Sequence, residues 1–331
     1  MRVTVLAGGI GGARFLKGLQ SYLNEVDPDG RITVIGNTGD DIWVHGLRVS
    51  PDLDTVMYTL GDGIDTDRGW GRRDETFHAK DELQAYGVEP TWFGLGDRDI
   101  GTHLVRTASL NAGYSLSDVT RALCERWQPG VELLPMTDDR AETHVVVDSP
   151  DDPGTRVAIH FQEWWIKHRA SLPAHDFVII GIEKASPAPG VLEAIADADV
   201  IIFPPSNPIV SIGTILAVPG ISEALMTTSA PIVGVSPIIS GAPVRGMADA
   251  CLSARGIDTS AAAVALNYGA RQADGLLDGW LVDTSDTAAV PLIEAAGITC
   301  RAVPLFMTDV PATALMAKEA IELAHAIAAA G

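Results

Sequence analysis

The chain has few cysteines, and their spacing argues against two kinds of site. Its 331 residues include only Cys124, Cys251 and Cys300, which lie far apart and form no Cys-x-x-Cys pair. A sparse, odd set of cysteines is typical of a reducing compartment and supports neither a disulfide framework nor a structural zinc site. We therefore expect a cytoplasmic protein that is stabilised by an apolar core.

The chain also lacks a long uninterrupted apolar run and an excess of positive charge. Its longest apolar stretch, residues 315–330, is interrupted by Lys318, Glu319 and Glu322 and is too short to span a bilayer. The formal net charge is −20, from 43 acidic and 23 basic residues. Neither nucleic acid nor an anionic membrane is an expected partner of so acidic a chain. A small anionic substrate is still compatible, because one pocket can gather arginines, backbone amides and a metal ion.

Short apolar runs rich in Val and Ile recur along the chain, each ending in glycine, proline or a polar turn. Runs that are apolar throughout, rather than alternating, are typical of buried strands in a parallel sheet. Helix-like stretches lie between several of them. This alternation predicts one α/β domain over residues 1–331 with a doubly wound, mostly parallel, Rossmann-like sheet. The runs are residues 3–7, 32–36, 177–181, 200–203, 232–235, 280–282 and 298–303, and the helices between or after them include 13–23, 191–198 and 311–330.

The pattern changes between about residue 54 and residue 160. Helical candidates at 75–86, 102–110 and 116–127 follow one another without a convincing strand. Short runs at 131–134, 143–147 and 156–161 then indicate a small β region. We expect a mainly helical inserted subdomain at the ligand edge of the sheet.

A glycine turn follows the first predicted strand. Gly8, Gly9, Gly11 and Gly12 form it, and a predicted helix begins next. Glycines let a phosphate approach the backbone, and a helix N-terminus offers free N–H groups and a favourable dipole. The turn is therefore a candidate phosphate site, with a turn that serves packing alone as the alternative. The NAD-binding pattern fails because Arg14 replaces its third glycine, and the P-loop pattern fails because no Gly-Lys-Ser/Thr follows.

Carboxylates gather after the second predicted strand. Asn37 lies at the strand end, Asp40 and Asp41 follow at once, and Asp54 comes a little later. We expect them beside the glycine turn, because the carboxyl ends of neighbouring parallel strands share one edge. Carboxylates repel a phosphate unless a cation intervenes, and Mg²⁺ takes oxygen ligands and bridges to phosphate. These residues are candidates for a Mg²⁺ site, with turn-forming and helix-capping aspartates as the alternative.

Two later predicted strands also end in polar loops. Ser206 and Asn207 follow the run at 200–203, and Ser240 and Gly241 follow the run at 232–235. Hydroxyl, amide and free backbone groups at such strand ends suit recognition of a phosphate or a base. Ordinary proline-rich turns are the alternative.

The order of five motifs along the chain resembles the CofD/FbiA family. The motifs are the glycine turn, residues 37–41, Ser50-Pro51-Asp52-Leu53-Asp54-Thr55-Val56, Leu95-Gly96-Asp97-Arg98-Asp99 and Pro205-Ser206-Asn207-Pro208. The resemblance spans essentially the whole chain, and the arginine-rich composition is most like that of mycobacterial members. Members are 2-phospho-L-lactate transferases, or phosphoenolpyruvate transferases in actinobacteria, of deazaflavin coenzyme F-420 biosynthesis.

The resemblance implies a phosphotransferase that is usually a homodimer. A guanosine diphosphate-linked donor would give its phosphoenolpyruvyl (or 2-phospho-L-lactyl) group to the terminal ribityl hydroxyl of the deazaflavin acceptor, 7,8-didemethyl-8-hydroxy-5-deazariboflavin. GMP would leave, and Mg²⁺ would assist. YvcK-like regulators, which share the fold and the glycine turn and bind a nucleotide sugar without turnover, are the alternative. The run at 50–56 favours the transferase, because it belongs to the deazaflavin side of the family's site.

The resemblance also implies roles for single residues. Asp54 corresponds to the aspartate that contacts the deazaflavin, and Asp54, Asp41 and Arg98 are the catalytic candidates, with Arg106 as another residue to offset charge. Metal binding is expected from Asp40, Asp41 and Asp54. Flat platforms for the deazaflavin are expected among Trp43, Trp70 and Trp92. The donor would be held by Gly8, Gly9, Gly11, Gly12, Asn37, Ser206, Asn207, Ser240 and Gly241.

Overall fold

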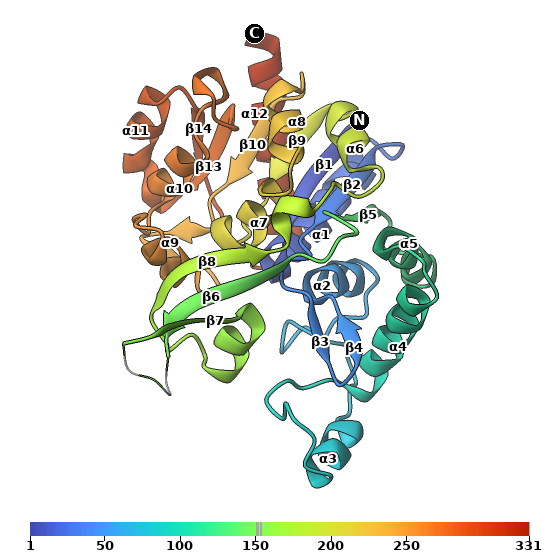
Figure 1. Cartoon of the computed structure of the whole chain (residues 1–331). Coiled ribbons are helices and arrows are strands. Elements are labelled where there is room, and N and C mark those ends of the chain that lie inside the picture. Colours follow the sequence, from blue (N-terminus) through green and yellow to red (C-terminus); the bar gives the residue numbers. More distant parts are fainter. Residues whose placement is uncertain (150–151, 153, 331) are drawn as a thin grey trace.

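A parallel sheet of seven strands forms the centre of the protein (Figure 1). The computed structural model describes residues 1–149, 152 and 154–330. The strand order is β14-β13-β10-β9-β1-β2-β5, and every neighbouring pair is parallel. The order runs outward in both directions from β1 and β9, which confirms the predicted doubly wound, Rossmann-like fold. The strands are β1 (Arg2–Ala7), β2 (Arg31–Gly36), β5 (Glu132–Pro135), β9 (Val200–Phe203), β10 (Ile232–Val235), β13 (Gly279–Asp283) and β14 (Thr299–Val303).

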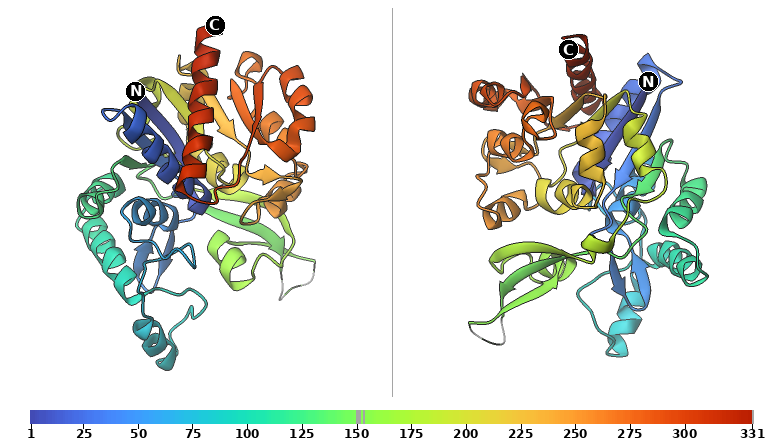
Figure 2. Two further views of the ribbon diagram at one scale, coloured as in Figure 1. Left: turned by 180° about the vertical axis from the view of Figure 1, so that it is seen from behind. Right: turned by 45° about the horizontal axis from the view of Figure 1, so that its top comes forward.

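Helices cover both faces of this sheet. Successive side chains of a strand point to opposite faces, so each face of the sheet has an apolar surface that helices bury. Val3 and Val5 of β1 belong to one buried apolar cluster, whereas Leu6 belongs to the other. Figure 2 shows the long C-terminal helix α12 running along one face. The first cluster includes α1 (Gly9–Val26), α2 (Pro51–Leu60), α5 (Leu116–Trp127) and α12 (Val310–Ala330). The second includes α6 (Val191–Ala196), α7 (Gly213–Leu216), α8 (Ile221–Thr227), α9 (Ala248–Ala254), α10 (Ala261–Tyr268) and α11 (Val290–Ala295).

The structure corrects two predicted strands. The run at 131–134, predicted in a small β region, forms β5 and pairs in parallel with β2 at the edge of the central sheet. The range 54–160 therefore includes one core strand, and the helices before it connect β2 to β5. The run at 177–181, predicted as a buried parallel strand, belongs mostly to β8 (Ala174–Ile180), which pairs antiparallel with β6 (Glu142–Asp148). With β7 (Arg156–His160) these strands form a separate three-stranded sheet, which packs over an apolar cluster of its own.

A small hairpin that follows β2 was missed by the sequence pattern. β3 (Ile42–Val44) and β4 (Leu47–Val49) pair antiparallel across a turn at His45 and Gly46, whose φ angles of 51° and 78° suit a two-residue hairpin turn. The Arg48 amide donates to Thr107 of α4 (Asp97–Asn111) at 2.8 Å. The hairpin is thereby attached to α4, and α3 (His78–Ala85) projects beyond it (Figure 1).

None of the described helices is by itself both long enough and apolar enough to cross a bilayer, whereas one bent pair, Pro208–Leu216 with Ile221–Thr227, meets both conditions by length and composition alone.

Candidate active site

A cavity of about 1480 Å³ lies at the carboxyl ends of the central strands. β1 and β9 are neighbours, and the chain order reverses between them. Ligands of open α/β sheets bind at such a switch point. The predicted donor residues Gly8, Gly9, Gly11, Ser206 and Asn207 all line this cavity. The topology therefore brings together two of the polar loops that the sequence singled out.

The glycine turn packs directly on the loop that follows β9. A Cβ at Gly11 would lie 2.3 Å from the Pro205 carbonyl oxygen, and one at Gly12 would lie 2.8 Å from the Ser206 hydroxyl. Ser206 donates to the Gly8 carbonyl at 2.8 Å and accepts from the Gly8 amide at 3.3 Å. Gly12 does not line the cavity, so close packing accounts for it. Gly9 has a φ of 62° and opens onto the cavity, where a bound group can approach the start of α1.

The two predicted asparagines hold other parts of the site in place. Asn207 accepts from the amides of Ile209 and Val210 at 2.9 and 3.2 Å and so caps the short helix η3 (Pro208–Ile212). Asn37 is buried beneath the cavity and donates to Asp52 Oδ2 at 2.9 Å. Asn37 therefore does not line the cavity itself but orients Asp52, which does.

Ser240 and Gly241 lie outside the cavity lining, which corrects their predicted place beside the donor. They form the turn between β11 (Ile238–Ile239) and β12 (Ala242–Pro243), with φ angles of 51° and 76°. The Ser240 amide donates to Asp286 at 2.9 Å. A hairpin turn that needs positive φ at both residues accounts for this pair.

The three carboxylates predicted as metal ligands do not come together. Among the described residues, no group of three or more His, Cys, Asp or Glu side chains is arranged to hold a metal ion. Asp41 lies behind the cavity wall and accepts from Ser50 at 2.6 Å and from Arg48 Nε at 3.1 Å. Asp54 is paired with a buried arginine, Arg106. Of the three, only Asp40 lines the cavity with a buried oxygen that has no hydrogen-bond partner in the described structure.

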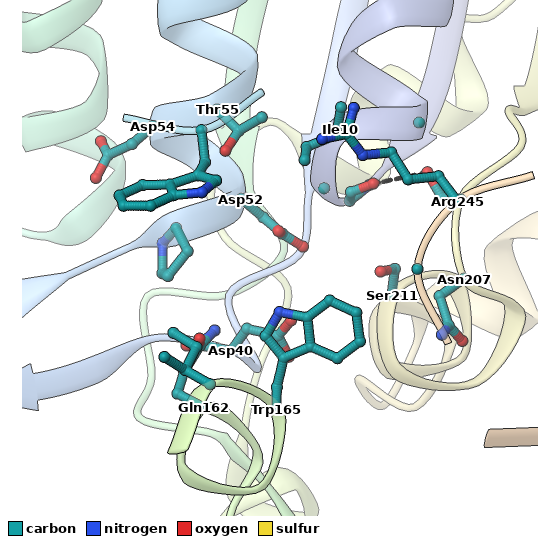
Figure 3. A pocket seen from close by; sticks show the side chains of 18 of the residues that line it. Ile10, Asp40, Asp52, Asp54, Thr55, Gln162, Trp165, Asn207, Ser211 and Arg245 are labelled. Atoms are coloured by element: carbon teal, nitrogen blue, oxygen red, sulfur yellow. Dashed lines mark hydrogen bonds between the residues drawn. The ribbon is translucent and has the colours of Figure 1, made fainter. Parts of the chain in front are cut away.

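Asp52, which lies in the motif at residues 50–56 but was given no role of its own, is the second carboxylate beside Asp40. Both side chains line the cavity, and Figure 3 shows Asp52 in the middle of the view, between Asp54 and Ser211, with Asp40 below it beside Gln162. Burial, and then the nearby Asp52, raises the pKa of Asp40 well above its ordinary value. Burial also raises the pKa of Asp52 to about 6, although hydrogen bonds from Asn37 and the Gly9 amide oppose the shift. Two buried carboxylates that resist ionisation fit a divalent cation, which supplies the missing positive charge.

Asp52 and Asp54 have different environments because they lie two positions apart in the first turn of α2, where i and i+2 side chains do not face each other. Asp52 turns towards Asn37 and the glycine turn. Asp54 turns towards α4, where Arg106 Nη1 donates to its Oδ2 at 3.0 Å and Nη2 donates to its Oδ1. A buried fork of this kind fixes the orientation of the carboxylate.

Arg98, the predicted catalytic cation, does not line the cavity. Its side chain is half exposed, and its guanidinium lies 4.0 Å from Asp74 at the surface. The cations that do line the cavity are Arg14, Arg68, Lys80, His103 if protonated, and Arg245.

Of the three tryptophans predicted as platforms, Trp70 and Trp92 line the cavity and Trp43 does not. Trp165, which was not predicted, also lines it. Trp165 stacks on Phe161 with an interplanar angle of 13° (Figure 3 labels Trp165).

Comparison with known proteins places this arrangement in a family. The model of 2-phospho-L-lactate transferase CofD matches residues 3–297. A phosphoenolpyruvate transferase of Streptomyces griseus subsp. griseus is 65% identical over 99% of this chain and 100% of its own length. One from Mycobacterium avium is 58% identical over 98% of this chain and 99% of its own.

The fold is also known from a solved structure. The crystal structure of protein BH3568 from Bacillus halodurans has a TM-score of 0.60 and 18% sequence identity, and it covers 97% of this chain and 99% of its own. This likeness concerns the fold alone. The family match and the full-length relatives show that the chain belongs to the CofD family of transferase enzymes.

Proposed function

We propose that this protein transfers a phosphoenolpyruvyl (or 2-phospho-L-lactyl) group from a guanosine diphosphate-linked donor to the terminal ribityl hydroxyl of 7,8-didemethyl-8-hydroxy-5-deazariboflavin and releases GMP. Membership of the CofD family supports a transferase of coenzyme F-420 biosynthesis. The names of its relatives favour the enolpyruvyl donor. The observation that carries the proposal is the cavity at the switch point, which combines a helix N-terminus, two buried carboxylates and several cations.

The donor side of the proposal rests on the glycine turn and its surroundings. The start of α1 suits a diphosphate, because free N–H groups and the helix dipole favour negative charge. Asp40 and Asp52 would hold Mg²⁺, which when bound neutralises charge on the diphosphate. Arg14 and Arg245 line the same part of the cavity and add positive charge. A chain with a net charge of −20 thus presents cations where an anionic donor would bind.

The acceptor side rests on Asp54 and the aromatic wall. Asp54 lines the cavity with its carboxylate held by Arg106, and it can accept a hydrogen bond from the acceptor hydroxyl. Trp70 and Trp92, which also line the cavity, offer flat surfaces for a ring system. The hydroxyl oxygen would form a bond to the distal phosphorus and give its proton to the Asp54 carboxylate. The bond from that phosphorus to the bridging oxygen would break, so that GMP leaves with the bridging oxygen. Phosphoryl transfer of this kind depends mainly on positioning and charge neutralisation, which is what these residues provide.

The test mixes the protein with Mg²⁺, the deazaflavin acceptor and each of the two guanosine-linked donors, and identifies products by mass. We expect the acceptor to gain the phosphoenolpyruvyl group and GMP to appear in equal amount. Asp40→Asn and Asp52→Asn should each lose turnover at the Mg²⁺ concentration that saturates the wild type, whereas Asp74→Asn, at an exposed position, should keep wild-type turnover and Mg²⁺ dependence. Absence of product with both donors, together with tight binding of a nucleotide sugar, would instead favour the regulatory alternative.

A further inference from the structure

A buried polar network lies between α2 and α4 on the acceptor side of the cavity. Asp99, His103 and Arg106 follow one another at i, i+4 and i+7 on α4, so they share one face of the helix. Asp54 and Tyr58 share a face of α2 in the same way. His103 and Arg106 are each only 1% exposed. All members except Arg106 line the cavity.

His103 lies between a cation and an anion. Its Nδ1 is 3.2 Å from Arg106 Nη1, and its Nε2 is 3.5 Å from Asp99 Oδ2. A guanidinium has only donors, so Nδ1 must accept and cannot carry a proton in this arrangement. The ring proton therefore resides on Nε2, which faces Asp99. The contact at 3.5 Å is long for a hydrogen bond and acts mainly as an attraction between the N–H and the carboxylate.

The groups around His103 support this assignment. Although burial lowers it, the neighbouring Asp54 carboxylate raises the pKa of Arg106 above its ordinary value, so Arg106 stays cationic. Burial acts to raise the pKa of Asp99, but His103 and the Tyr58 hydroxyl, which donates at 2.5 Å, outweigh this effect. The pKa of Asp99 therefore lies below its ordinary value, and Asp99 stays ionised. His103 Nδ1 also lies 3.8 Å from Asp54 Oδ2, but a proton on Nδ1 would point at the Arg106 guanidinium, which has no acceptor. A neutral ring satisfies both neighbours.

We infer that His103 is a positioning residue, which as a neutral Nε2–H imidazole holds Arg106 in the orientation that aims Asp54 at the acceptor hydroxyl. The inference rests on the proposed function, because the hydroxyl is that of the proposed acceptor. Arg106 Nη1 donates to both His103 Nδ1 and Asp54 Oδ2. Loss of the acceptor at position 103 frees this nitrogen to turn, and the Asp54 carboxylate turns with it. Misplacement of a substrate-orienting group by about 1 Å can cost about 100-fold in rate.

The kinetic test compares His103→Leu with His103→Gln. Glutamine can present one acceptor to Arg106 and one donor to Asp99, whereas leucine presents neither. We expect His103→Leu to lower kcat by about 10- to 100-fold with the KM for the donor and the affinity for GDP nearly unchanged, and His103→Gln to recover most of the loss. Normal turnover in His103→Leu, or equal impairment in both variants, would overturn the inference.

A spectroscopic test uses the wild-type protein and needs no turnover. The ring nitrogens of ¹⁵N-labelled histidine are measured by NMR at neutral pH, and the His103 signals are assigned by their absence from the His103→Gln spectrum. We expect a neutral ring with the proton on Nε2. A doubly protonated ring, or a proton on Nδ1, contradicts the inference. Because this measurement is independent of the acceptor, a wild-type protein that forms no product but shows the Nε2–H ring would refute the proposed function alone.

Discussion

Replacement of Asp52 by asparagine is expected to make the protein more stable and less active. Asp52 is 7% exposed, and burial raises its pKa from 3.8 to about 6. A shift of about two units corresponds to about 3 kcal/mol of unfavourable free energy for the ionised form in the folded state. Asparagine carries no charge, and its amide oxygen can still accept the hydrogen bond from Asn37. The free energy of unfolding should therefore rise by up to about 3 kcal/mol at about pH 8.

The sign of the pH dependence follows from the raised pKa. Between about pH 4 and pH 6 the folded wild-type protein binds more protons at Asp52 than the unfolded chain does, so its stability falls as the pH rises through this window. The variant lacks this contribution. Its advantage over wild type should be largest at about pH 8, about half as large at pH 5, and nearly absent below about pH 4.

The assay is urea unfolding of both proteins in the presence of EDTA at several pH values, with Asp74→Asn as the control. The side chain of Asp74 is 79% exposed, so the control should differ little from wild type at every pH. An Asp52→Asn protein that is no more stable than wild type at about pH 8, or whose advantage is the same at every pH, would refute the reasoning. A more stable but inactive variant would show that the carboxylate is retained for function at the expense of stability.

Two further comparisons test the packing of the site. Arg106→Gln leaves Asp54 as a buried charge without its partner and should cost about 3–5 kcal/mol in urea unfolding, whereas Arg98→Gln should change stability by less than about 0.5 kcal/mol and keep turnover. Unfolding midpoints that move equally in both variants would contradict the assignment of Arg106 to the buried pair. Gly11→Ala should lower both stability and turnover, because its new methyl group would meet a backbone carbonyl at 2.3 Å. Gly101→Ala, in an open position on α4, should instead stabilise by up to about 1 kcal/mol, and a neutral effect at both glycines would argue against the close approach at the turn.

The core strands were predictable because their local pattern and their environment agree. The runs at 200–203 and 232–235 are apolar throughout and form β9 and β10 with those bounds. The run at 177–181 is also apolar, but in its antiparallel sheet only Phe177 is buried, Val178 and Ile179 are partly exposed, and Ile180 is exposed. A short apolar run does not specify its partner strand. The partner of a strand depends on how the connections before and after it run. The structure therefore places β5 in the central sheet and β8 in the small antiparallel sheet, the reverse of the prediction.

Some polar residues of the cavity could likewise be identified from the sequence, and others could not. The glycine turn, Asp40, Asp54 and Ser206 were identified because each follows a strand or belongs to a compact motif. Asp52 belongs to the same motif as Asp54 but received no role of its own, because the direction of a side chain in the first turn of a helix depends on how that helix packs.

The sequence by itself determined the doubly wound class, the edge of the sheet at which the site lies and the family resemblance. These follow from hydrophobic periodicity and from glycines and polar residues at strand ends, which act locally. Only the tertiary structure decided which carboxylates share the cavity. Burial and neighbouring carboxylates raise the pKa of Asp40 and Asp52, whereas Asp54 is paired with Arg106. These environments form only where α2, α4 and the loop after β9 meet.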